Sequence, residues 1–410
     1  MSEPILVVNA AFGAIKYHLV DVDQKEPLVR GKASGIGQSS PGEVALTTSE
    51  QTYLLEREFP DHRSALAAIL GLIEQHGPPI SQIAAVAHRV VHGADRFTAP
   101  TVITPAVLDA IRELSPLAPA HNPKALSGIL AAESLLPDIP HVAVFDTSFF
   151  ADLPAAAATY ALPVGMMERL RIRKYGFHGL THRYVSERAS LLLGRHDLRQ
   201  IVCYLGNGSS ISAVDSGRPI DVSTGFTMID GLPTRARSGS IDPGIHRYVM
   251  GRTGMDIVEF DRILSEESGM LGLTGMTDQR QIWTAADQGD ERAALAIDVL
   301  VHRIVSYVSA FHGVLGGAQA IAFTGTVGEQ DVRIRKAVCD RLACFGVEID
   351  EGINAKTHGP IRSRIISTPR SAIAVLMVQQ REPLAQAREC AILLGWKRNS
   401  TTRWDAVVAH

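Results

Sequence analysis

The segment Gly206-Asn207-Gly208-Ser209-Ser210 has the residue types that bind phosphate in proteins. Its glycines let backbone N–H groups approach an anion, and its serines add hydroxyl donors. An apolar run precedes the segment and an alternating run follows it, which is also the pattern of a plain β-hairpin. On these residues alone, a phosphate loop and a hairpin turn are equal alternatives.

A second turn of this kind lies at residues 9–16, Asn-Ala-Ala-Phe-Gly-Ala-Ile-Lys. It follows the apolar run 4–8 and leads into the alternating run 15–20, which predicts a strand, a turn of small residues and a second strand. A lysine at the exit of such a turn often contacts phosphate, and Lys16 has that position. Apolar residues stand where hydroxyls are expected, so this turn is either an altered phosphate loop or only a hairpin.

Arginine, histidine and aspartate residues elsewhere could complete an anion site. Arginine suits bidentate contact with carboxylate or phosphate, which makes Arg89 and Arg237 candidates for anion binding. His178 stands beside an aromatic residue and between glycines and is a candidate donor, whereas we expect His182 to be structural. Asp146 ends an apolar strand, where it could be the general base of an alcohol kinase or a helix cap.

The patterns between these segments predict the elements that position them. Helices are predicted at 63–76, 105–114, 181–193 and 291–314, and buried strands at 84–91, 141–145 and 320–324. Strands that alternate with helices favour an α/β fold with ligands at the carboxyl ends of the strands. The polar residues that close strands, namely Asn9, Asp146 and Thr324, therefore mark the expected site. The two hairpins open the two halves of the chain, which indicates a duplicated domain.

The composition limits the class of protein. A length of 410 residues favours two domains, and 46% hydrophobic with 20% charged residues is ordinary for a soluble protein. The net charge of −3 predicts no nucleic-acid partner. Four cysteines without paired spacing are read as reduced thiols of a cytoplasmic protein. No apolar run approaches the about 20 residues of a membrane helix, and no basic region precedes the apolar N-terminus, so neither a membrane partner nor a secretion signal is predicted.

Taken in order, these and other segments resemble the acetate kinases of the acetokinase family, a branch of the sugar-kinase and actin superfamily. The similar segments lie within residues 4–395, at 88–97, 118–126, 144–150, 160–163, 174–185, 205–214, 225–232, 237–244, 268–280 and 323–330. The resemblance implies an α/β, duplicated actin-like (ribonuclease-H-like) fold with an interdomain cleft. It also implies three parts of the chain: residues 1–147 plus 381–398, with a returning C-terminal helix; a nucleotide-binding domain at 148–380; and a tail at 399–410. A homodimer is implied as well.

The activity implied is reversible, ATP-dependent phosphorylation of acetate or a close short-chain acid, giving ADP and an acyl phosphate such as acetyl phosphate by direct in-line transfer. The implied cofactor is Mg²⁺, or Mn²⁺ in its place. Such a transfer has a loose transition state, so catalysis is mainly positioning and electrostatics. A carboxylate is already ionised near neutral pH and needs no base, which suits two arginines and a histidine.

The resemblance also implies a role for each matching residue. The catalytic residues would be Asp146, His178, Arg237, Arg89 and His121. The acid would contact Arg89 and an apolar pocket of Val91, Ala120, Phe177 and Met228. The nucleotide would contact Lys16, Gly206, Asn207, Gly208, Ser209, Asp278, Gln279, Arg280, Gly325, Thr326, Val327, Gly328 and Gln330. The metal would be held through water by Asn9 and Glu382.

The chain departs from the family pattern mainly in the turn at residues 10–14. The pattern there has a glycine followed by three serines, and this chain has Ala11, Phe12, Gly13 and Ala14. Elsewhere Arg235 replaces a glycine, Ser240 an aspartate and Thr326 a glycine, while Gln330 replaces an asparagine. Losing one preorganised donor typically costs about 2.7–4 kcal/mol of transition-state stabilisation, so a weakened enzyme is one expectation.

Three alternatives stay open at this level. Ala120 stands where leucine is usual and Met228 where proline is usual, so a propionate kinase is one alternative. The altered loops also fit a catalytically impaired nucleotide-binding homologue with a regulatory role. A superfamily kinase for an alcohol or sugar, with Asp146 as base, is the third.

Overall fold

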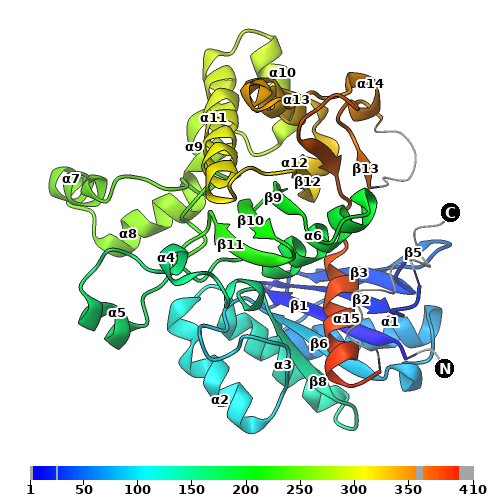
Figure 1. The fold of residues 1–410 in the computed structure, drawn as a ribbon. Helices are drawn as coiled ribbons and strands as arrows, with labels where there is room; N and C mark the ends of the chain where they lie inside the picture. The colour runs from blue at the N-terminus through cyan, green and yellow to red at the C-terminus, as the bar shows by residue number, and fades with distance from the viewer. Residues whose placement is uncertain (1–2, 25, 357–362, 397–410) are drawn as a thin grey trace. The chain divides into compact units, whose positions relative to one another are not determined.

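The computed structural model describes residues 3–24, 26–356 and 363–396, so the predicted tail at 399–410 lies outside the described residues. These residues form two compact units (Figure 1). Unit 1 holds the described residues up to Ala151 and from Arg381 onward, and unit 2 holds Asp152–Gln380. The chain therefore passes from one unit to the other twice.

Unit 1 is a mixed sheet with helices packed on it. Its strands are β1 (Ile5–Ala11), β2 (Ala14–Val20), β3 (Val29–Ser34), β4 (Gly42–Thr47), β5 (Thr52–Arg57), β6 (Ala85–Val90), β7 (Thr101–Val102) and β8 (His141–Phe145). Its helices are α1 (His62–His76), α2 (Pro105–Glu113), α3 (Asn122–Leu135) and α15 (Glu382–Leu393). The strand order is β5-β4-β3-β2-β1-β6-β8-β7.

Unit 2 is built in the same way. Its strands are β9 (Arg199–Tyr204), β10 (Ser210–Asp215), β11 (Arg218–Val222), β12 (Ala320–Thr324), β13 (Arg364–Ile365) and β14 (Ala374–Met377). Its helices are α4 (Ala155–Ala158), α5 (Val164–Leu170), α6 (Gly179–Leu193), α7 (Gly244–Thr253), α8 (Ile257–Arg262), α9 (Gly269–Thr274), α10 (Gln279–Asp287), α11 (Glu291–Val314), α12 (Gly325–Gln330), α13 (Val332–Arg341) and α14 (Glu351–Asn354). The strand order is β11-β10-β9-β12-β14-β13.

The two sheets repeat one topology. In each, three antiparallel strands (β3-β2-β1 and β11-β10-β9) are followed by two strands parallel to the last of them (β6-β8 and β12-β14). The duplicated α/β fold predicted from the sequence is confirmed. The predicted helices and strands are present, each within a few residues of its expected bounds.

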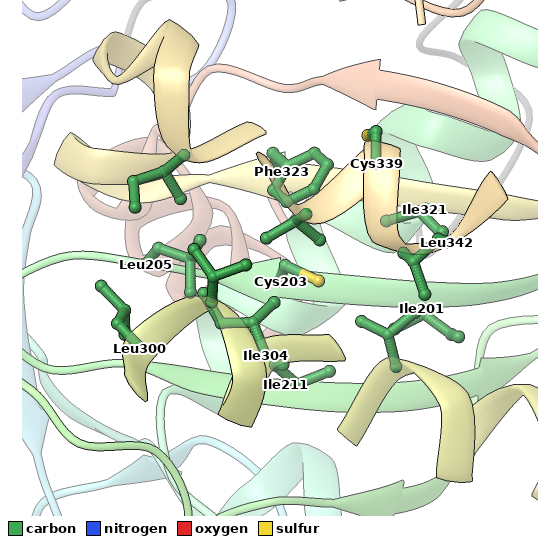
Figure 2. Packing of buried hydrophobic residues seen from close by; sticks show 14 of the residues in the cluster. Ile201, Cys203, Leu205, Ile211, Leu300, Ile304, Ile321, Phe323, Cys339 and Leu342 are labelled. Atoms are coloured by element: carbon green, nitrogen blue, oxygen red, sulfur yellow. The ribbon is translucent and has the colours of Figure 1, made fainter. Parts of the chain in front are cut away.

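The core of unit 2 forms where α11 and α13 cover β9, β10 and β12 (Figure 2). Residues of α11 at three- and four-residue spacing, such as Leu300 and Ile304, pack with Ile201 and Cys203 of β9 and with Phe323 of β12. By length and composition, α11 is the one described helix that could also cross a membrane. Its apolar face lies inside this core, as expected for the central helix of a folded domain.

The first hairpin is tighter than the sequence predicts. β1 continues to Ala11 and β2 begins at Ala14, so only Phe12 and Gly13 form the turn. Gly13 has φ +63°, a left-handed conformation that glycine adopts without strain, and this permits a two-residue turn. The ring of Phe12 is 80% exposed, and the Lys124 ammonium lies 5.0 Å from its centroid. The residues that close this hairpin therefore carry no hydroxyl.

Helix α3 lies so close to β1 that Gly128 admits no side chain. A Cβ at Gly128 would lie 2.5 Å from the Cβ of Ala10, whereas a Cβ at Gly71, on the exposed side of α1, would meet nothing within 4 Å. We expect Gly128→Ala to lower the free energy of unfolding by about 1–3 kcal/mol, because overpacking must displace α3. Gly71→Ala should raise it by roughly 0.5–1 kcal/mol, because it only favours the helix. Urea unfolding of both variants measures the two changes, and equal signs would contradict this packing.

Candidate active site

Parallel pairing places three candidate residues of unit 1 at one edge of its sheet. Val8 of β1 pairs with His88 of β6, so Asn9 and Arg89 follow at the same level. Val90 pairs with Phe145 of β8, and the Asp146 N–H donates to the Val90 carbonyl oxygen at 3.0 Å. The sequence singled out Asn9 and Asp146 as polar residues that close strands, and in unit 1 both lie at this edge together with Arg89.

Arg89 is held by two carboxylates. Its Nε and Nη2 donate to the two carboxylate oxygens of Asp146 at 2.9 and 2.5 Å, and Glu382 Oε1 lies 3.2 Å from Nε. Asp146 is 1% exposed, and burial raises its pKa against the opposing charge of Arg89. Since both oxygens of Asp146 bind Arg89, this carboxylate is placed to orient the guanidinium.

Glu382 is the first residue of α15, which packs on β1, β2 and β6. The Gln386 side-chain amide, one turn later, donates to Glu382 Oε1 at 3.0 Å. Asn9 is half-buried and pairs across the hairpin with the exposed Lys16. The proposed metal-side residues thus both belong to unit 1.

Hydrogen bonds of the buried Asn122 connect the remaining candidates of unit 1. Its Oδ1 accepts from the His92 N–H at 3.1 Å, and its Nδ2 donates to the His92 carbonyl at 2.9 Å. The segment that carries Val91 is thereby tied to the start of α3, where His121 occupies the N-cap position without a capping hydrogen bond from its side chain and Ala120 is exposed. Asn122 was not singled out from the sequence, because its partner is thirty residues away.

In unit 2, the segments that follow two parallel strands meet. The sequence predicted both as loops, but the second, Gly325–Gln330, is the short helix α12. Tyr204 at the end of β9 pairs with Thr324 at the end of β12. The Leu205 carbonyl accepts from the N–H groups of Val327 and Gly328 at 3.0 and 3.2 Å. Gly325 has φ +82°, and a Cβ there would lie 2.5 Å from the Leu205 carbonyl oxygen, so only glycine fits. The segments 206–209 and 325–330 therefore form one surface.

A cavity of about 790 Å³ opens on this surface. Of the residues predicted to bind nucleotide, Gly206, Asn207, Ser209, Asp278, Gln279, Arg280, Thr326, Val327 and Gln330 line it. Gly208 lies in the same loop, and Gly325 and Gly328 lie in α12, without lining the cavity; Lys16 belongs to unit 1.

Sequence reasoning missed one wall of this cavity. Trp283 of α10 donates its indole N–H to Asp331 at 2.8 Å, and the Arg333 guanidinium covers its ring at 3.8 Å from the centroid. All three residues line the cavity, as does Arg235. Asp331 and Arg333 directly follow the predicted loop 325–330, which was a usable signal; Trp283 had none, because it reaches the wall through tertiary packing.

A hydrogen-bonded chain fixes His178. Its backbone is in the left-handed region at φ +61°, immediately before α6. His178 Nδ1 contacts Ser210 Oγ at 3.0 Å, and a Cβ built on Gly208 would lie 3.1 Å from His178 Nε2 and 3.6 Å from Arg237 Nη1. His178 and Arg237 therefore converge on the glycine-rich loop. Burial lowers the pKa of Arg237.

His182 completes this chain from inside the protein. It is fully buried, with Nε2 and Nδ1 each 2.7 Å from the hydroxyls of Ser210 and Ser212. Burial lowers the pKa of His182 to about 3. This placement agrees with the structural role expected from the sequence. The last two predicted pocket residues also lie in unit 2, where Phe177 is buried and Met228 half-buried.

The fold and the site together define a class. Two units repeat one α/β topology, and the second carries a cavity between a glycine-rich loop and α12 at its strand ends. This is the architecture of the duplicated actin-like class. The model of the acetokinase family matches residues 4–388, and the chain belongs to that family.

Individual relatives agree with this assignment. The acetate kinase of Pseudothermotoga lettingae is 41% identical, over 94% of this chain and 96% of its own length. The acetate kinase of Leifsonia xyli is 42% identical, over 94% and 97%. The crystal structure of Porphyromonas gingivalis acetate kinase has a TM-score of 0.90 at 36% identity, covering 96% of this chain and 100% of that one. A propionate kinase from Francisella tularensis has a TM-score of 0.89 at 34% identity, covering 94% and 98%.

The absence of a side chain at Gly208 leaves space for His178 and Arg237. We expect Gly208→Ala to reduce ATP turnover at least tenfold, because its Cβ would press on His178 Nε2. Its φ is not in the left-handed region, so the free energy of unfolding should change by less than about 1 kcal/mol. Steady-state kinetics and urea unfolding separate the two effects. Unchanged turnover would show that His178 and Arg237 do not need this space.

The buried neutral His182 makes stability depend on pH. Between pH 6.5 and about 3, the unfolded chain binds a proton at this residue that the folded chain excludes. The free energy of unfolding therefore falls as pH drops through this window, by about 1.4 kcal/mol per pH unit for one such group. We expect His182→Gln to flatten the dependence between pH 6 and 5 by nearly one proton in urea unfolding. The matched variant His196→Gln, at an exposed residue, should keep the wild-type slope; equal slopes in all three proteins would contradict this origin.

Proposed function

We propose that this kinase transfers a phosphoryl group reversibly from ATP to the carboxylate of acetate or a close short-chain acid, giving ADP and an acyl phosphate. The family and the names of the relatives support the reaction class. The observation that carries the proposal is the pairing of Asp146 with Arg89 through both carboxylate oxygens. An acid substrate needs no base, whereas an alcohol would need a free one.

The side chains divide the work by charge. Arg89, oriented by Asp146 and Glu382, binds the acid carboxylate. Arg237 and His178 stabilise the three equatorial oxygens of the phosphoryl group in flight, where donors fixed in advance have most effect. His121, in unit 1, is a further catalytic residue that the family resemblance implies. Because His178 Nδ1 is engaged by Ser210, the Nε2 edge is the one offered to the phosphoryl group.

The nucleotide occupies the cavity of unit 2, within a nucleotide-binding domain of residues 148–380. The other domain of the proposal, residues 1–147 plus 381–398, is the N-terminal actin-like domain with its returning C-terminal helix, and it carries Arg89, Asn9 and Glu382. In unit 2, the loop 206–209 and the start of α12, where Thr326 lines the cavity, border the phosphates. Lys16, in unit 1, is a further nucleotide-binding residue that the family resemblance implies. Asp278, Gln279 and Arg280 contact the nucleoside, since they line the same cavity at the start of α10.

The donor set fits Mg²⁺. Asn9 and Glu382 offer the amide and carboxylate oxygens that this ion prefers, and the ion usually keeps several waters. No group of three or more His, Cys, Asp or Glu side chains that could hold a metal occurs among residues 3–24, 26–356 and 363–396. Asn9 and Glu382 would hold the hydrated ion, or Mn²⁺ in its place. When bound, it neutralises charge on the transferring phosphates.

For the apolar part of the acid, the family resemblance implies contacts with Val91 and Ala120, which unit 1 carries, and with Phe177 and Met228, which unit 2 carries. A propionate kinase is the second candidate, favoured by the small, exposed Ala120 and by the Francisella tularensis relative of that name. We place the protein in the cytoplasm, because its four cysteines are free thiols and three of them are buried.

A homodimer is part of the proposal and rests on family resemblance. α7 and α8 of unit 2 support it, since they expose Tyr248 and Val258 at 65% and 74%. Large apolar side chains at that exposure are suited to an interface.

Hydroxylamine trapping of acyl phosphate tests the reaction. Purified protein with magnesium ATP should form hydroxamate from acetate, propionate or butyrate, and the ranking of the three acids identifies the substrate. Arg237→Ala should lose about 10²–10³ in rate, the usual effect of removing one transition-state donor. Arg218→Ala, at an exposed position on β11 outside the site, is the matched control and should keep full rate.

Two results would contradict the proposal. One is hydroxamate formation that Arg237→Ala leaves unchanged. The other is ATP binding without hydroxamate from any of the three acids, which would favour a nucleotide-binding protein without this chemistry.

A further inference from the structure

Three arginines line the nucleotide cavity, and two of them are already neutralised. Arg280 donates to both carboxylate oxygens of Asp278 at 3.2 and 2.7 Å. Arg333 donates to both carboxylate oxygens of Asp287 at 2.7 and 2.8 Å. The third, Arg235, is exposed, and its guanidinium has no hydrogen bond or ion pair with any described residue.

The backbone that carries Arg235 is rigid. The Thr234 N–H donates to the Arg237 carbonyl at 3.0 Å, which closes a tight turn. The N–H groups of Met270 and Leu271 donate to the carbonyls of Thr234 and Arg235 at 2.9 Å each, and the turn is thereby bound to α9. Gly269 lies against this turn so closely that a Cβ there would be 2.2 Å from the Thr234 carbonyl oxygen.

The same turn carries Arg237, which faces Gly208 of the phosphate loop. Arg235 lines the cavity together with Gly206 and Asn207 of that loop. A rigid turn therefore presents one cation to the transferring group and a second, uncompensated cation to the cavity. An arginine without a carboxylate partner at the rim of an anion site attracts anions and forms bidentate, charge-assisted hydrogen bonds to phosphate.

We propose that Arg235 binds a phosphate of the nucleotide and so sets the preference of this site for nucleoside di- and triphosphates over nucleosides. This inference rests on the proposed function, because it assumes a nucleotide in this cavity. It assigns to Arg235 a contact that the glycine of the family pattern at this position could not make with a side chain. Arg280 and Arg333 stay bound to their aspartates and shape the cavity without adding net charge.

Calorimetric titration of the full chain with ATP, ADP and adenosine tests the assignment without turnover. Arg235→Gln should raise the Kd of ATP and ADP about tenfold and leave that of adenosine within twofold. Arg235→Lys should recover part of the affinity, because it keeps the charge and loses the bidentate geometry. The ATP affinity of Arg235→Gln should also depend less steeply on salt than that of wild type, since one ionic contact is lost. Arg218→Gln is the matched control and should bind all three ligands as wild type does.

The outcomes separate this inference from the proposed function. Suppose that the wild-type protein binds ATP and forms hydroxamate, and that Arg235→Gln binds ATP with unchanged affinity. This result overturns the role of Arg235 and leaves the proposed function standing. Equal weakening of ATP and adenosine, or equal loss in the glutamine and lysine variants, also overturns the role of Arg235, because the charge would not be the cause. A wild type that binds none of the three ligands overturns the proposed function and this inference together.

Discussion

Parallel pairing of strands is the constraint on which each candidate site depends. Parallel strands end at the same edge of a sheet, and in both units the polar or glycine-rich residues begin where the strands stop. In unit 1 the register of β1, β6 and β8 sets Asn9, Arg89 and Asp146 side by side. In unit 2 the register of β9 and β12 joins the loop 206–209 to α12 through the Leu205 carbonyl. A one-residue slip in either register would separate these groups.

Electrostatic pairing then decides what each charged group can do. Arg89 is fixed by a buried and a half-buried carboxylate, which restrict the orientation of its guanidinium. Because the side chain is already ordered, it loses little conformational entropy when a substrate binds. Both carboxylate oxygens of Asp146 accept hydrogen bonds from Arg89, so this carboxylate is better placed to orient the guanidinium than to act as a base. Neutral His182 and Ser210 fix His178 without adding charge near the glycine-rich loop 206–209. His178 is thus positioned by neutral partners, which add no negative charge that would repel an anion.

Local sequence patterns predicted the fold well, but they could not predict contacts between segments that are distant in the sequence. Residue spacing was sufficient for α11 and the buried strands, because each has a long and regular period. The predicted length of the first turn was wrong, because the alanines at positions 10, 11 and 14 fit strands as readily as turns and lie in β1 and β2. The Trp283 wall could not be predicted from spacing. The pairing of Arg333 with Asp287 joins distant segments. Sequence alone therefore could not tell which arginine of the cavity lacks a carboxylate partner.

The altered first hairpin and the retained charges bear on the same question of activity. The turn offers the exposed ring of Phe12, with Lys124 against it, where the family pattern has hydroxyls. A chain that had lost selection for catalysis would be free to lose charged partners, yet Arg89, Asp146 and Glu382 are still in contact. Gly208 and Gly325 also keep their close approaches, which no stability argument requires of Gly208. Because this geometry is intact in both units, we interpret residues 11–14 as a change in the phosphate contacts proposed for this hairpin rather than as decay of the enzyme.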